Sequence, residues 1–282
     1  MDIRMPDFAG SWYPAGSSEC RKEIQGYVNK SLRLSSPDLK RVGGIVPHAG
    51  WFFSGQIACN VINCLRHNSP DAVVLFGMHL SPASGNYIMK QGLWNTPLGD
   101  LEIHQGLAQR LCAEFPFIIE TAARHSQDNT IELQLPFVKY FFPDAGIVTM
   151  GVPPVAGSLK IGQRVVEIAE ELGIDIVVIG STDLTHYGYN YGFTPEGTGE
   201  EALDWVRNEN DRRVIDRIIA MDAEGVISEG LTHQNVCCSG AAATAIAAGL
   251  KLGATKAEKV VYATSHDKSP GSNFVGYAGL VF

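Results

Sequence analysis

The sequence has few of the patterns that mark nucleic-acid-binding or membrane proteins. Its 22 Lys and Arg residues form no cluster long enough to follow a phosphate backbone, and its net charge is -8. An acidic chain without a basic patch argues against binding to nucleic acid or to anionic membranes. No apolar stretch reaches the roughly 20 residues of a membrane span, and residues 1–7 lack the apolar core of a signal peptide. We therefore expect a cytoplasmic protein.

Several common catalytic and redox motifs are also missing. The six cysteines include no CxxC pair, which argues against a zinc ribbon or a thioredoxin-type site. The chain has no GxSxG elbow, no HExxH pair, no Walker A loop and no GxGxxG turn after a strand. It has no Pro- or Ser-rich linker and no internal repeat, so we expect one domain over residues 1–282.

What the sequence does contain is an alternation of short apolar runs with helical patterns. Runs typical of buried strands cover residues 42–46, 72–76, 86–90, 145–150, 174–179, 260–263 and 274–282. Helical patterns cover residues 17–32, 55–66, 105–114, 159–172, 199–221 and 240–253, and residues 129–137 begin another helix. This alternation predicts an α/β fold with a mainly parallel central sheet and helices on both faces.

Four of the predicted strands are followed by a histidine: His48, His79, His186 and His266. Ligands of open α/β sheets bind beyond the carboxyl ends of the strands, so parallel strands would place these imidazoles along one edge. We expect His48 and His79 to lie on adjacent strands, close enough to share an ion. Imidazole is the commonest metal ligand and a frequent acid–base group. The pattern therefore predicts a metal site or a histidine-based catalytic site.

Further polar side chains accompany two of these segments. Asp183 and Tyr187 flank His186 and offer an orienting carboxylate and a hydroxyl, although Asp183 is equally suited to stabilising a turn. Cys237 and Cys238 precede an Ala-rich helix, where the helix dipole lowers a thiol pKa and favours a nucleophile or ligand. The alternative is a pair of small buried residues at a tight helix start.

Other polar residues are weaker candidates. His233 and Asn235 lie just before the cysteines and could line the same rim. Glu132 is either an acidic group of the site or a first-turn helix carboxylate. We expect the remaining histidines to lie on the surface; they are His67, His104 and His125.

Six motifs, in order over nearly the whole chain, resemble the Memo family. They are Ala9-Gly-Ser-Trp-Tyr-Pro14, Pro47-His-Ala-Gly50, Phe76-Gly-Met-His79, Thr130-Ile-Glu-Leu-Gln-Leu-Pro-Phe137, Ser181-Thr-Asp-Leu-Thr-His186 and Val275-Gly-Tyr-Ala278. The sequence departs from the family pattern in two places. Asn129 stands where the family usually has histidine, and the Gly-Met-His segment is one residue shorter.

The resemblance implies a fold similar to the catalytic subunit of class III extradiol dioxygenases, which are non-haem iron enzymes. It implies metal ligands at His48, His79 and Cys237, with the cysteine in place of the dioxygenase carboxylate. It also implies an acid–base role for His186, beside Asp183. Microbial members of the family often occur beside a radical-SAM protein and an AMMECR1-like protein, which are the pathway partners expected here.

Three functions are consistent with these residues. The leading hypothesis is a metal-dependent redox protein that binds Fe(II), with copper or zinc as alternatives, and acts on a small-molecule substrate. The second is a signalling module that keeps the pocket without catalysis and binds a small ligand or peptide. The third is a zinc hydrolase, because two histidines and a cysteine form a known catalytic zinc set.

Overall fold

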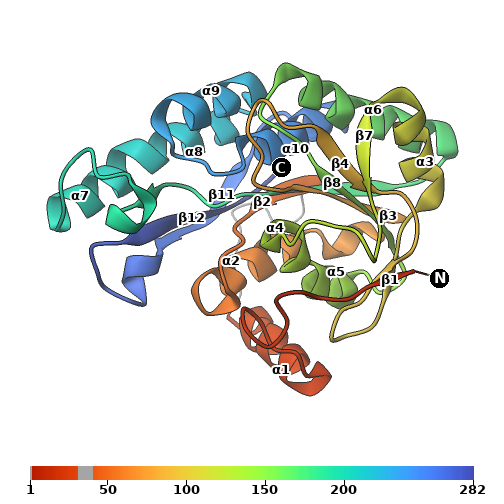
Figure 1. The fold of residues 1–282 in the computed structure, drawn as a ribbon, viewed down its shortest axis with the longest axis horizontal. Helices are drawn as coiled ribbons and strands as arrows, with labels where there is room; N and C mark the ends of the chain where they lie inside the picture. Colours follow the sequence, from red (N-terminus) through yellow and green to blue (C-terminus); the bar gives the residue numbers. More distant parts are fainter. Residues whose placement is uncertain (1, 31–40) are drawn as a thin grey trace.

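The structure of the protein is a computed structural model that describes residues 2–30 and 41–282. Within these residues the main element is a nine-stranded sheet (Figure 1). Its strands lie in the order β10 (His186–Tyr187), β12 (Phe274–Val281), β2 (Gly43–Val46), β9 (Ile176–Ser181), β3 (Ala72–Gly77), β8 (Gly146–Gly151), β4 (Asn86–Met89) and β7 (Phe117–Glu120). Strand β11 (Glu258–Thr264) pairs with β12 beside this path.

The centre of the sheet is parallel. Strands β2, β9, β3 and β8 all run in one direction, and nearly all their residues are buried. Strand β12 is antiparallel to both β2 and β11, so β11 again runs in the direction of β2. A small separate sheet joins β1 (Ile3–Arg4), β5 (Leu93–Trp94) and β6 (Leu101–Glu102). Continuous apolar runs form strands that are covered on both faces.

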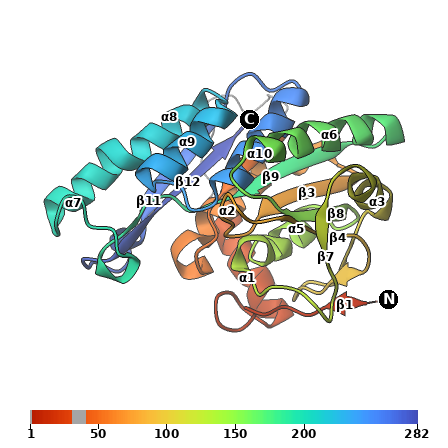
Figure 2. The same ribbon diagram turned by 45° about the horizontal axis from the view of Figure 1, so that its top comes forward.

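Helices cover both faces of the main sheet (Figures 1 and 2). One layer contains α1 (Ser17–Val28), α2 (Trp51–Cys64), α4 (Asn129–Glu132) and α5 (Leu135–Phe141). The other contains α3 (Gln105–Glu114), α6 (Ala156–Leu172), α8 (Asp211–Ile219), α9 (Ala223–His233) and α10 (Ser239–Lys251), with α7 (Glu200–Trp205) beyond one end. The predicted fold class, α/β with a mainly parallel sheet between helical layers, is confirmed.

The Ala-rich helix α10 lies between the sheet and α6. All but two of its residues are buried, and small side chains let the neighbouring elements approach closely. A Cβ atom on Gly162 of α6 would lie 2.3 Å from the carbonyl oxygen of Thr244 in α10. This close packing fixes the first turn of α10 above the carboxyl ends of the central strands.

The element boundaries differ from the predicted ones where local sequence is a poor guide. Helix α1 ends at Val28; residues 29–30 of the predicted helix form a turn, and residues 31–32 lie outside the described residues. The segment 129–137 forms two helices rather than one, because Pro136 occupies the first turn of α5. The segment 199–221 is interrupted by a π-helical turn at Val206–Asn210. The prediction omitted strand β7 and helix α9.

Among the described residues, no helix combines the length and apolar character needed to cross a membrane.

Candidate metal centre

The residues that follow the central strands meet at one edge of the sheet. His48 follows β2, His79 follows β3, and Asp183 follows β9. The expectation that His48 and His79 come from adjacent strands is wrong, because β9 lies between β2 and β3. The two imidazole rings nevertheless reach across β9, and their centroids are 4.9 Å apart.

A cysteine pair completes the cluster. One potential ligand atom from each of His48, His79, Cys237 and Cys238 lies within 4.8 Å of all the others. The Sγ atom of Cys237 is 3.4 Å from Nε2 of His48 and 3.7 Å from Sγ of Cys238. These four residues come from three distant parts of the chain, and together they form a possible metal-binding site.

The hydrogen bonds of His48 determine which of its nitrogens is available to a metal. The Ser181 hydroxyl donates its one hydrogen to the carbonyl oxygen of Thr130 at 2.7 Å. It must therefore accept from Nδ1 of His48, which lies 3.1 Å away. Nδ1 therefore carries a proton, and Nε2, which faces Cys237, is the nitrogen available to a metal.

His79 is oriented in a similar way by a carboxylate. Its Nδ1 atom is 3.4 Å from Oδ2 of Asp128, which leaves Nε2 available as a ligand. Burial opposes ionisation of Asp128, but hydrogen bonds from His79 and Thr130 outweigh it and lower the pKa of this carboxyl group. Asp128 also caps α4 by accepting from the backbone N–H of Thr130. The sequence analysis missed Asp128, and its position as a helix cap before Asn129 was the available signal.

The short Gly-Met-His segment requires an unusual backbone conformation. Met78 has a φ angle of 72°, in the left-handed region, and its N–H donates to Oγ1 of Thr130 at 2.7 Å. A Cβ atom on Gly77 would lie 2.4 Å from the same oxygen. Glycine at this position therefore allows α4 to approach β3, and the turn brings His79 into the cluster. Asn129, the other departure from the family pattern, donates to the carbonyl oxygen of His48 at 2.8 Å.

Asp183 lies between two histidines. Its Oδ1 accepts from the backbone N–H of His48 at 2.7 Å, and its Oδ2 is 3.9 Å from Nε2 of both His48 and His186. Burial raises the pKa of Asp183, and the neighbouring imidazoles only partly offset this effect. The Asp183 carboxylate therefore lies close to His48, a candidate metal ligand, and to His186, the candidate acid–base group.

His186 has a nitrogen available for chemistry. Its Nε2 atom is buried and has no hydrogen-bond partner among the described residues. Burial lowers the pKa of His186, but the nearby Cys237 and Asp183 reverse the direction and raise it. An unpartnered buried nitrogen beside a cavity is suited to exchanging a proton with a bound molecule.

The two cysteines differ in ionisation. Burial would raise the pKa of Cys237, but the Cys238 thiol and the imidazoles of His48 and His186 lower it well below its usual value. The backbone N–H of Asp183 also points at Cys237 Sγ, at 3.3 Å. Burial and the Cys237 thiolate raise the pKa of Cys238.

The other residues singled out near the site have structural roles. The Tyr187 hydroxyl donates to the carbonyl oxygen of Gly197, and its ring stacks on Phe274 with a centroid distance of 5.1 Å. The ring of His266 also packs against Phe274, whereas its neighbour Ser265 lines the cavity.

His233 and Asn235, which precede the cysteines in the sequence, do not line the cavity beside the metal cluster. His233 lies beside Arg213. Asn235 is buried and donates to the carbonyl oxygen of Asn210 at 2.9 Å. Both side chains therefore contact the α8–α9 layer, and the expectation that they line the rim is not met.

Glu132 serves the N-terminal loop rather than the cluster. Its carboxylate accepts from the backbone N–H groups of Asp7 and Phe8 and from the Tyr13 hydroxyl, at 2.8 to 2.9 Å. It lies in the first turn of α4, as the helix interpretation expects, and it is buried.

Of the three histidines expected on the surface, only His67 is exposed. His104 caps α3, with its Nδ1 accepting from the N–H of Leu107, and His125 lies 3.3 Å from Asp7. Both are half-buried.

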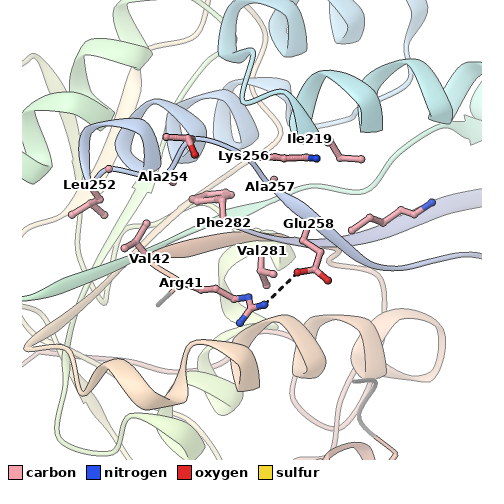
Figure 3. Close-up of a pocket in the computed structure, with 13 residues that line it drawn as sticks. Arg41, Val42, Ile219, Leu252, Ala254, Lys256, Ala257, Glu258, Val281 and Phe282 are labelled. Carbon is pink, nitrogen blue, oxygen red and sulfur yellow. Dashed lines mark hydrogen bonds and ion pairs between the residues drawn. The ribbon is translucent and has the colours of Figure 1, made fainter. Parts of the chain in front are cut away.

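A cavity of about 620 Å³ opens above the cluster. His48, His79, Asp183 and His186 are on its wall, together with aromatic and uncharged polar side chains. A second cavity, of about 670 Å³, lies at the other end of β2, where Arg41 and Val42 line it (Figure 3). It contains the Arg41–Glu258 ion pair, with 3.3 Å between Nη2 and Oε2, and the described residues that line it include no histidine or cysteine. The first cavity is therefore the candidate for metal chemistry.

Comparison with known proteins relates the whole chain to one family. A family model described as "Memo-like protein" matches residues 4–281. The chain is 35% identical to a MEMO1 family protein of Methanopyrus kandleri, over 99% of this chain and 98% of that protein. It is 32% identical to a MEMO1 family protein of Thermococcus kodakarensis, over 99% of both chains. An uncharacterised protein of Escherichia coli K12 has a similar fold, with a TM-score of 0.55, 14% identity, and coverage of 85% of this chain and 98% of that chain.

Proposed function

This chain belongs to the family of Memo-like proteins, and on that premise we propose that it is a metal-dependent redox protein in which His48, His79 and Cys237 bind Fe(II). The observation that carries the proposal is the convergence of these side chains beside a cavity. Both imidazoles have their Nδ1 atoms occupied by hydrogen bonds, which leaves each Nε2 for the ion.

The donor set fits a divalent transition metal. Imidazole suits iron, copper and zinc, and thiolate favours the softer ions among them. The neighbouring imidazoles and the Cys238 thiol lower the pKa of Cys237, which favours the thiolate form that binds metals. Three protein ligands leave coordination positions for other molecules, as in the iron oxygenases with two histidines and one carboxylate. Copper is the first alternative to Fe(II), and zinc the second.

The metal would supply a site where a substrate oxygen becomes more acidic. His186 would accept the proton that a phenolic, catechol-like substrate loses, because its Nε2 is unpartnered. The negative charge of Asp183 would stabilise the protonated form of His186, since Oδ2 lies 3.9 Å from that nitrogen. These roles correspond to those of the class III extradiol dioxygenases. In this chain the Cys237 thiolate takes the place of the dioxygenase carboxylate, so ring cleavage is tested separately below.

A radical-SAM protein and an AMMECR1-like protein are the partners we propose for this reaction. The cavity would take the small molecule that such a pathway supplies or consumes.

A non-catalytic binding function is supported by a different observation. Aromatic side chains at the mouth of the cavity are partly exposed: Trp12 by 41%, Tyr191 by 46% and Phe52 by 65%. Exposed aromatic residues around a pocket are typical of surfaces that bind ligands or peptides. This alternative predicts thermal stabilisation by a ligand without turnover.

The test is metal content by elemental mass spectrometry after anaerobic purification and reconstitution. We expect about one iron per chain in the wild type and loss of most of it in His48→Ala, His79→Ala and Cys237→Ala. His67→Ala, which removes an exposed histidine outside the cluster, is the matched control and should bind as the wild type does. A wild type that stays metal-free after reconstitution would refute the proposal and favour the binding function.

Oxygen chemistry needs its own measurement. The iron-loaded protein is mixed with a panel of phenols and catechols in air, and oxygen consumption and ring-cleaved products are measured. We expect turnover that is lost in His186→Ala while metal content stays near that of the wild type. No turnover across the panel would contradict the dioxygenase-like chemistry and leave the metal site intact.

A further inference from the structure

The site contains one more potential ligand than the three already assigned. Cys238 is 3% exposed, and its Sγ belongs to the same cluster of ligand atoms as those of His48, His79 and Cys237. A buried cysteine at a helix start is often only a small apolar residue. Three observations favour a role for Cys238 as a metal ligand.

The first observation is the spacing of the sulfur atoms. In a tetrahedral site with metal–sulfur bonds of about 2.3 Å, two sulfur ligands lie about 3.8 Å apart. The Sγ atoms of Cys237 and Cys238 are 3.7 Å apart. A sulfur and an imidazole nitrogen in such a site lie about 3.5 Å apart, and Cys237 Sγ is 3.4 Å from His48 Nε2. These two separations match those of ligands around one ion, and the other ligand atoms lie within 4.8 Å of one another.

The second observation is that the backbone holds both cysteines in place. The N–H of Cys237 donates to the carbonyl oxygen of Asp183 at 3.1 Å, and the N–H of Cys238 donates to Oγ1 of Thr182 at 3.0 Å. Both acceptors belong to the residues that follow β9. The same segment thus positions the two sulfur atoms relative to the sheet edge where the histidines lie.

The third observation is that the Cys238 side chain is not used to cap its helix. Cys238 occupies the N-cap of α10, and the side chain makes no capping hydrogen bond. Serine, threonine, asparagine and aspartate are the usual choices for this position because their oxygen atoms satisfy the free N–H groups. The thiol is instead directed at Cys237, toward the cluster.

We propose that Cys238 is a second thiolate ligand, so that four protein side chains bind the ion. The inference rests on the proposed metal site and concerns its coordination. On binding, the divalent ion takes the place of the Cys238 thiol proton, which is released to solvent. Two thiolates balance the two charges of the ion, which favours its transfer into a partly buried site.

With four protein ligands, the number of coordination positions left for other molecules depends on which metal is bound. Zinc in a site of two cysteines and two histidines is four-coordinate and closed. Octahedral Fe(II) would keep two positions for substrate or another small molecule. The same chain would therefore hold zinc as a closed site and iron as an open one.

Cobalt(II) tests this because its absorption reports both the geometry and the number of thiolates. Protein purified anaerobically is titrated with Co²⁺, and the near-ultraviolet sulfur-to-cobalt band is measured for wild type and Cys238→Ala. We expect the band to fall by about half in the variant, because one of two thiolates is lost. Cys112→Ala, which removes a cysteine outside the cluster, is the control and should match the wild type.

An unchanged sulfur band in Cys238→Ala overturns the inference but leaves the three-ligand site. A wild type that binds no cobalt overturns the proposed metal site as well, so the two failures differ. A second measurement needs no variant: X-ray absorption of the zinc-loaded wild type should show two sulfur atoms at about 2.3 Å. One sulfur atom in that shell would contradict the proposal.

Discussion

Glu132 provides a sharp test of how the N-terminal loop contributes to the cavity. Its carboxylate accepts hydrogen bonds from Asp7, Phe8 and Tyr13, which are more than a hundred residues away in sequence. The same loop continues through Trp12, whose side chain lines the cavity above the metal cluster. Removing this carboxylate should therefore affect both stability and the cavity wall.

The expected magnitude follows from the number of donors left without a partner. A buried donor that loses its acceptor costs about 1–3 kcal/mol. Glu132→Ala leaves three, and the effects do not add fully because the loop can detach and become hydrated. We expect the free energy of unfolding to fall by about 3–5 kcal/mol in Glu132→Ala. Tyr13→Phe removes only one of the three hydrogen bonds and should lower the free energy of unfolding by about 1–2 kcal/mol.

Urea denaturation of both variants measures these free energies, and limited proteolysis shows whether cleavage begins within residues 7–13. The metal content of folded Glu132→Ala should remain near that of the wild type, because Glu132 does not belong to the cluster. If Glu132→Ala is no less stable than Tyr13→Phe, or if its loop resists proteolysis as in the wild type, then the Glu132 carboxylate does not hold the N-terminal loop in place.

Two other predictions concern buried hydrogen bonds near the site. Ser181→Ala removes the acceptor for Nδ1 of His48, so metal affinity should fall about 10- to 100-fold in a chelator competition assay; an unchanged affinity would contradict the tautomer assignment. Asp211 is fully buried beside Thr185 and Tyr262, and burial raises its pKa from 3.8 to about 6. The folded state then holds the proton more tightly, so stability should fall by about 3 kcal/mol as pH rises from about 4 to about 6. Asp211→Asn should flatten this dependence in thermal unfolding, and an unchanged slope would refute the assignment.

The fold could be predicted from sequence because its central strands are continuous apolar runs. Such runs in β2, β3, β8 and β9 indicate strands buried on both faces, and parallel strands bring their following residues to one edge. That reasoning is enough to bring His48 and His79 together. It did not give the strand order, which depends on long-range pairing, and so it placed the two histidines on neighbouring strands when β9 separates them.

His266 shows where the strand-end argument stops. Strand β11 runs in the same direction as β2, as the sequence pattern required, but β12 lies between them. Beyond the end of β11, Ser265 lines the cavity and the His266 ring packs on Phe274. A strand end fixes the edge on which a residue lies, but the direction of its side chain depends on the next turn of the backbone.

Contacts between distant segments are where sequence reasoning falls short. It missed Asp128, which reaches His79 across 49 positions, and it named Glu132 without its partner Asp7, 125 positions away. Neither carboxylate has a local pattern that identifies its partner. Both lie at or near α4, a helix of only four residues whose importance comes entirely from what it contacts.

The first turn of α4 links the two halves of the candidate metal site. Asp128 accepts from the His79 ring, and Asn129 donates to the backbone of His48. Thr130 accepts from the backbone of Met78, and its carbonyl oxygen receives the Ser181 hydroxyl that orients the His48 ring. Three consecutive residues thus hold both imidazoles, although the histidines follow strands that do not pair. The spacing of the two ligands is therefore determined by the position of α4 on the sheet as much as by the strands themselves.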